Sequence, residues 1–119
     1  MATTFNKIYD LKKRTFMFAR NVIKYVDKMP KKVSGIEIGR QLIRSAGSVG
    51  ANYIEADEAL SRKDFIMRIK ICKKEAKESQ YWLQLSEPRT EEQRLKTHLV
   101  DESIQLVKIF ATIIRNSNT

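Results

Sequence analysis

The chain has 119 residues and a single cysteine, so it suits one domain whose core forms without an intrachain disulfide. No apolar run approaches the roughly 18 residues that a membrane span requires, and the sparse cysteine usage fits a reducing compartment. We therefore expect a cytoplasmic protein without a membrane partner. The 23 basic and 14 acidic residues give a net charge of +9, which favours a polyanionic partner, nucleic acid first.

Apolar residues recur every three or four positions through most of the chain, which is the spacing of amphipathic helices. This spacing predicts four helices, at about residues 11–28, 35–59, 62–85 and 91–115. A repeat close to 3.5 residues favours left-handed packing, and short connections make neighbouring helices antiparallel. The sequence therefore predicts an all-α, up-down-up-down, left-handed four-helix bundle that occupies residues 1–119 as one domain.

Three possible capping boxes mark the starts of the second, third and fourth helices. Ser34, Ser61 and Thr90 are each followed three residues later by an acid or an amide. In such a box the hydroxyl accepts a hydrogen bond from a free backbone N–H of the first helical turn. We expect each of these hydroxyls to cap its helix.

The second, third and fourth helices each carry a second apolar row beside the row expected to form the core. One bundle core needs one row per helix, so the extra rows indicate a second buried surface, most simply a subunit interface. The alternative is a wide stripe that faces one large core. The candidate interface residues are Gly47, Gly50, Ala51, Ile54, Trp82, Val100, Ile104, Val107 and Ile114.

Small residues crowd the second helix, where Gly47 and Gly50 lie beside Ala51, and the two glycines are unfavourable in an otherwise good helical sequence. Glycine inside a helix costs about 1 kcal/mol relative to alanine. Close approach of another helix offsets that cost through packing, whereas a kink in the helix would leave it uncompensated. We expect close approach.

A polar row runs along the same helix through Ser45, Ser48, Asn52 and Glu55, spaced three, four and three residues apart. The row is either a ligand or catalytic site, or a hydrogen-bond network that fixes the register between helices. We favour the network, because a serine nucleophile needs a base and the only histidine, His98, lies far away in sequence.

No motif for catalysis, metal binding or nucleotide binding is present in the sequence. Cys72 falls on the core row, which suits a buried thiol better than a nucleophile. His98 is not part of the Glu-x-x-His pattern that di-iron bundles use. We expect no enzymatic activity, no cofactor and no metal.

Basic residues gather near the predicted helix ends and on the third helix. The candidate nucleic-acid-binding residues are Lys12, Lys13, Arg14, Lys28, Lys31, Lys32, Arg62, Lys63, Lys73, Lys74 and Lys77. Such clusters suit phosphate contacts to RNA or DNA. The alternative is a structural or protein-binding adaptor whose basic surface serves solubility.

Three motifs between Leu42 and Leu85 carry a family resemblance. Residues 48–52 read S-x-G-A-N, residues 61–65 read S-x-x-D-F, and residues 78–83 read E-x-x-Y-W-L. In this combination the stretch resembles the bacterial four-helix-bundle proteins related to the 23S ribosomal RNA intervening-sequence proteins.

At Gly50 and Ala56 this chain is similar to one branch of that family, whose members read GAN and then EA around these positions. The resemblance implies an up-down bundle that assembles into a homopentameric ring. It also implies nucleic-acid association, because some relatives act as accessory factors to a reverse transcriptase through a basic surface. A reverse-transcriptase-like protein is thus a candidate partner. The family has no established catalytic residues, so none is carried over.

Overall fold

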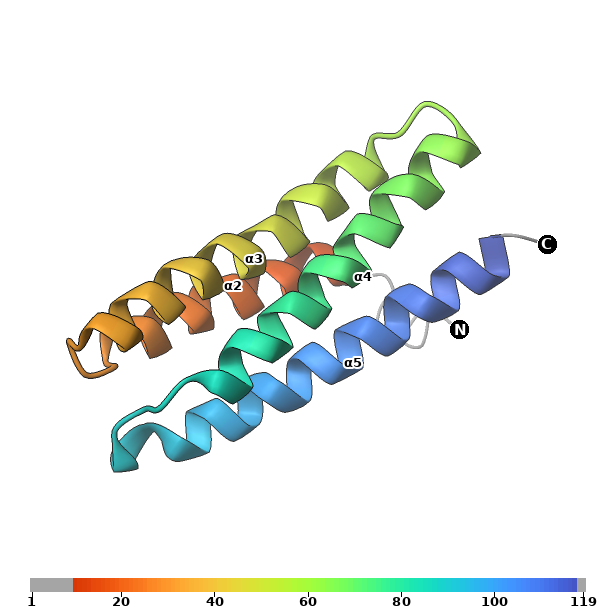
Figure 1. The fold of residues 1–119 in the computed structure, drawn as a ribbon. Helices are drawn as coiled ribbons and strands as arrows, with labels where there is room; N and C mark the ends of the chain where they lie inside the picture. Colours follow the sequence, from red (N-terminus) through yellow and green to blue (C-terminus); the bar gives the residue numbers. More distant parts are fainter. Residues whose placement is uncertain (1–9, 118–119) are drawn as a thin grey trace.

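Four long helices pack side by side in the computed structural model, which describes residues 10–117 (Figure 1). They are α2 (Leu11–Asp27), α3 (Val33–Asp57), α4 (Arg62–Leu85) and α5 (Gln93–Ser117), with a short 3₁₀ turn, η1 (Thr90–Glu92), before α5. Consecutive helices run antiparallel, and no strand occurs within 10–117. The all-α class with four helices is confirmed, whereas the handedness of packing and the ring stay predictions.

The capping signals are realised at only one of the three expected helix starts. The Ser61 hydroxyl accepts a hydrogen bond from the Asp64 backbone N–H at 3.0 Å, so it caps α4. The expectation for Ser34 is wrong, because α3 already begins at Val33 and Ser34 lies inside its first turn. Thr90 opens the η1 turn instead of an α-helix, so a 3₁₀ turn leads into α5.

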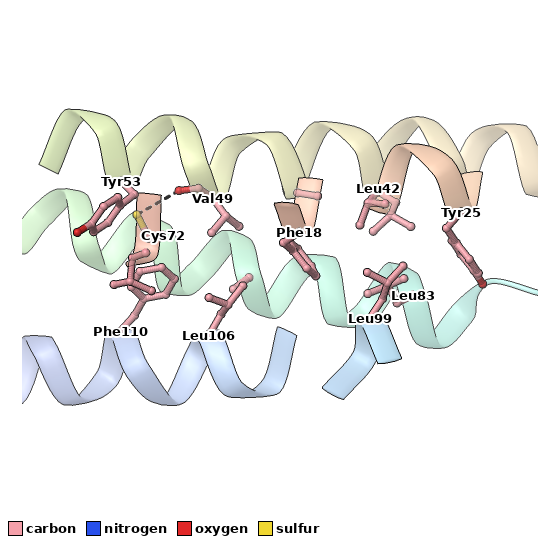
Figure 2. Packing of buried hydrophobic residues seen from close by; sticks show 14 of the residues in the cluster. Phe18, Tyr25, Leu42, Val49, Tyr53, Cys72, Leu83, Leu99, Leu106 and Phe110 are labelled. Carbon is pink, nitrogen blue, oxygen red and sulfur yellow. Dashed lines mark hydrogen bonds between the residues drawn. The ribbon is translucent and has the colours of Figure 1, made fainter. Parts of the chain in front are cut away.

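The core is a continuous column of apolar side chains along the axis, running from Tyr25 at one end to Phe110 near the other (Figure 2). Every helix contributes to it, for example through Phe18 on α2, Leu42 on α3 and Leu83 on α4, each at most 1% exposed. Because protein interiors are close-packed, this column fixes how the helices are rotated about their axes and therefore which residues face outward.

Two polar side chains from α2 lie inside this core. The Thr15 hydroxyl donates to the Leu11 carbonyl oxygen at 2.6 Å, which lets threonine fill a position in the apolar row. The Tyr25 and Ser86 hydroxyls share a hydrogen bond of 2.5 Å. Burial raises the pKa of Tyr25, although the bond to Ser86 opposes that rise, so the phenol stays neutral and ties α2 to the end of α4.

The glycines of α3 differ in what lies beside them. A Cβ at Gly39 would be 2.7 Å from Val26 Cγ1, and one at Gly50 would be 3.3 Å from Thr15 Oγ1. Helix α2 is therefore the element that approaches these two glycines closely. A Cβ at Gly47 would meet nothing within 4 Å among the described residues. Close approach inside the chain explains Gly50 but leaves Gly47 unexplained.

Cys72 is fully buried on α4, and its thiol donates to the Val49 carbonyl oxygen at 3.4 Å. Burial raises the pKa of Cys72 from 9.0 to about 12. Since the thiolate is the reactive form, three pKa units lower its fraction about 1000-fold at neutral pH. We expect a disulfide reagent such as DTNB to label the native thiol at least that much more slowly than in concentrated guanidinium chloride. Rapid labelling of the native protein would contradict this burial.

Candidate functional site

An apolar groove runs between α2 and α3, which we call the α2–α3 groove. It encloses about 600 Å³ and is lined mainly by Phe16, Ala19, Gly47, Gly50, Ala51 and Ile54. Phe16 is 60% exposed and Ile54 is 49% exposed, although both are large and apolar. Exposed apolar residues of this size that lie together are typical of an interaction surface.

Further exposed apolar residues extend the groove toward the other end of the helix pair. Ile23 lies seven residues after Phe16 on α2, and Ile36 and Ile43 lie on the face of α3 that carries Gly47. Residues seven apart share a helix face, so a strip rich in apolar residues follows the pair for most of its length, with exposed Arg20 and Arg40 between the apolar positions. No other helix within residues 10–117 covers Gly47.

The candidate interface residues fall into two sets. Gly47, Gly50, Ala51 and Ile54 line the α2–α3 groove. The others lie on α4 and α5, where they are partly buried: Trp82, Val100, Ile104, Val107 and Ile114. All of this second set except Ile104 pack against the core, which agrees with the alternative of a wide core stripe. The α2–α3 groove is therefore the part of the predicted interface that is open.

The polar row on α3 mostly joins α3 to α4. The Ser45 and Ser79 hydroxyls, both fully buried, form a hydrogen bond of 2.8 Å. Asn52 accepts from Arg68 Nη1 at 3.1 Å and donates to Ser48. These contacts favour a network that sets the register between the two helices. Glu55, in contrast, is exposed.

Arg44 holds the two carboxylates of α4 that face α3. Its Nη1 lies 3.7 Å from Glu75 Oε1, and its Nη2 donates to Glu78. Glu75 is more than nine-tenths buried, and its Oε1 has no hydrogen-bond partner within the part of the chain that the structure describes. Burial raises the pKa of Glu78, but the hydrogen bonds from Trp82 and Arg44 outweigh it, so this pKa lies below its ordinary value.

The outward face of α4 carries only basic, apolar and neutral polar residues. None of its exposed positions is acidic, because its three acids are at least partly buried. Five of its exposed positions are basic: Arg62, Lys63, Lys70, Lys74 and Lys77. Lys70 is not among the residues expected from the sequence, although its spacing of seven from Lys63 and Lys77 is a signal that could have identified it. Lys73, which was expected among the candidates, is partly buried.

The remaining basic candidates lie at the two ends of the helices. Lys12 and Lys13 are exposed at the start of α2, whereas Arg14 Nε donates to Glu102 Oε2 on α5 at 2.7 Å. This hydrogen bond to Glu102 raises the pKa of Arg14, so the guanidinium stays charged, and the paired Glu102 offsets that charge locally. At the opposite end, Lys28 Nζ lies 3.8 Å from Glu92 Oε1. Exposed Lys31 and Lys32 occupy the turn before α3.

Residues 10–117 hold no group of three or more histidine, cysteine or acidic side chains that could bind a metal ion. Over the same range, no helix is both long and apolar enough to cross a membrane.

Comparisons with known proteins give one family and a similar solved structure. A family model described as 23S rRNA-intervening sequence protein matches residues 7–111. A crystal structure of a protein of unknown function from the S23 ribosomal protein family of Bacteroides thetaiotaomicron is 32% identical, with a TM-score of 0.75. The alignment covers 87% of this chain and 96% of that one. No curated protein matches the chain.

Proposed function

We propose that this chain, which belongs to the 23S rRNA-intervening sequence protein family, is a non-enzymatic protein that associates with RNA or DNA. The observation that carries the proposal is the outward face of α4, where five basic residues are exposed and no acid is. Lys70 and Lys77 have no ion pair with any described residue. Their charges are therefore free to contact phosphates.

The placement of the α4 acids strengthens this assignment. Arg44 on α3 pairs with Glu75 and Glu78, and Lys74 also interacts electrostatically with Glu78, so the negative charge of these carboxylates is partly offset before a phosphate approaches. Phosphate contacts release bound counterions, so the affinity falls with salt by about 0.7 log units per log unit for each single-strand phosphate neutralised. Nothing on this face resembles a groove-reading element, so we expect little sequence preference.

A triple variant tests the proposal: Lys70→Gln, Lys74→Gln and Lys77→Gln. Removing three phosphate contacts is expected to make the salt slope for single-stranded RNA or DNA shallower by about 2. The helix should remain folded, because all three lysines are exposed. Fluorescence anisotropy with a labelled oligonucleotide across a salt series measures the slope.

A matched control removes the same charge elsewhere, by Arg89→Gln, Arg94→Gln and Lys108→Gln, all at exposed positions. It should change the slope by less than about 1. An equal effect of both variants would show that net charge, and not the α4 face, drives binding. If the unmodified protein does not bind at about 50 mM salt, the nucleic-acid proposal fails.

The α2–α3 groove supports a second role, self-association. A second copy of the chain can cover Gly47 and the exposed apolar strip around it, and the family resemblance implies a ring of five. The rival is a protein-binding adaptor, whose groove would take another protein such as a reverse-transcriptase-like enzyme. The mass of the isolated protein separates the two, because an adaptor without its partner would remain a monomer with an open groove.

A further inference from the structure

We propose that the outward face of α4 binds single-stranded nucleic acid, with Tyr81 stacking on an unpaired base. This inference rests on the proposed function and names the form of nucleic acid that the face accepts. It starts from one row of exposed residues, spaced four, three, four, three and four apart: Lys63, Met67, Lys70, Lys74, Lys77 and Tyr81. We call this set the α4 row.

The α4 row presents its charges in a line. Residues three and four apart on a helix have Cβ atoms about 5–6 Å from each other, so neighbouring lysines can contact successive groups of one backbone. At 1.5 Å per residue, the row from Lys63 to Tyr81 spans about 27 Å. A single strand can lie along such a line, whereas a duplex would meet it along one strand only.

Tyr81 gives the row an aromatic end. Its side chain is 58% exposed, and its ring packs edge-on against Trp82, with ring centroids 5.0 Å apart and planes at 74°. Trp82 is itself anchored, because it packs against the core and its Nε1 donates to Glu78 Oε1 at 3.3 Å. The tyrosine is thus held at the surface, as a stacking platform requires.

An open hollow of about 760 Å³ lies at the opposite end of the row. Ile66 and Met67 form its apolar part, and its rim is mainly basic, with Arg62, Lys63 and Lys70 beside one acid, Asp64. Apolar surface between cationic side chains suits a base next to its own phosphate. Aromatic stacking combined with a positively charged track is how proteins bind single strands without reading their sequence.

Single strands are distinguished from duplexes by the faces of the bases. In a duplex these faces are covered by neighbouring base pairs, so Tyr81 can stack only on an unpaired base. Lysine contacts to phosphates are available in both forms. The contribution of Tyr81 should therefore appear with single strands and vanish with duplexes, while the contribution of the lysines appears with both.

The test compares Tyr81→Ala and Tyr81→Phe with the unmodified protein, using labelled oligothymidine, oligouridine and a DNA duplex of about 15 units each. Loss of one stacked base should weaken binding of both single strands roughly 5- to 150-fold. Duplex binding should change less than about twofold, and Tyr81→Phe should retain single-strand affinity within about twofold, since the ring remains. A control variant, Val33→Ala, removes another well-exposed apolar side chain and should change neither affinity.

Ultraviolet crosslinking of a 5-bromouracil-substituted single strand gives a second measurement on the unmodified protein, and it should label the peptide that contains Tyr81. An unchanged single-strand affinity for Tyr81→Ala, an equal loss for duplex, or a loss with only one of the two sugars would overturn the stacking inference and leave nucleic-acid association intact. Absence of binding to all three probes by the unmodified protein would overturn the proposed function itself.

Discussion

A Gly47→Leu variant is expected to abolish the proposed self-association while its own helices gain stability. A Cβ at this position would meet nothing within 4 Å in the described chain, so replacing glycine by a good helix former should stabilise the isolated chain by about 0.5–1 kcal/mol. At a subunit contact, the added side chain would occupy the space of the neighbouring copy. Overpacking costs about 1–3 kcal/mol per contact, and a closed ring repeats it at every interface. Light scattering gives the mass, and thermal unfolding of the dissociated chain gives the stability.

The opposite directions of these two effects make the test specific. Gly47→Ala serves as the control, because its single methyl group gives the same gain in helix propensity with little intrusion into the α2–α3 groove. Ala51→Leu, one turn further along that groove, should also dissociate the assembly. An unmodified protein with the mass of one chain at about 10 µM would contradict self-association. A Gly47→Leu variant with unchanged mass would place the subunit contact elsewhere.

The four helices could be predicted because apolar spacing is a local property of the sequence. Positions such as Phe18, Val22, Leu42 and Leu106 recur at helical intervals and are all buried. Periodicity assigns a residue to a face, but it does not say how wide that face is. The second row on α5 illustrates this limit, since residues such as Val107 turn out to pack against the core.

The pairing of particular side chains could not be predicted, because it depends on how the helices are rotated against one another. Tyr25 meets Ser86 across 61 residues, and Arg14 meets Glu102 across 88. The same is true of the glycines. Thr15 approaches Gly50, whereas Gly47 remains open, and this difference depends only on the path that α2 takes across α3.

The candidate nucleic-acid surface was only partly predictable for a related reason. Counting charges identifies lysine-rich segments, but exposure decides which of those lysines can contact a phosphate. Lys73 and Lys74 are adjacent in sequence, yet only Lys74 is exposed. The pairing of Glu75 and Glu78 with Arg44 is a tertiary feature, and it offsets part of the negative charge that a local count would set against the lysines.

The Arg44 cluster gives the largest stability effect that we expect from removing one charge. An Arg44→Met variant would leave the Glu75 carboxylate buried without a counter-ion and would remove a hydrogen bond from Glu78. Breaking a fully buried ion pair costs about 3–5 kcal/mol. Because Arg44 is 51% exposed and water reaches the broken pair, we expect about 2–3 kcal/mol. Urea unfolding at a fixed protein concentration measures the loss.

Two further variants test whether the loss of stability comes from breaking this buried pair or from removing any surface arginine. Arg40→Met on the same helix breaks only an exposed pair with Glu37, so it should cost less than about 0.5 kcal/mol. Glu75→Gln removes the buried charge while Arg44 keeps Glu78, so it should cost less than about 1 kcal/mol. When Glu75→Gln is combined with Arg44→Met, the double variant should be at least about 1 kcal/mol more stable than Arg44→Met alone, because no buried carboxylate remains unpaired. Additive effects of the two changes would show that Glu75 and Arg44 do not interact.

The pH dependence of the same variants tests the contact independently. Since the pKa of Glu78 is lowered in the folded chain, its contribution to stability is present above the ordinary value of 4.5 and is lost as the pH falls through the lower, folded value. Arg44→Met removes both a hydrogen bond and a charge that lower this pKa, so the stability of the variant should fall less steeply with acid below about pH 4.5. If the stability of the unmodified protein and that of Arg44→Met fell equally steeply with acid, Arg44 would not be holding Glu78 in its charged form.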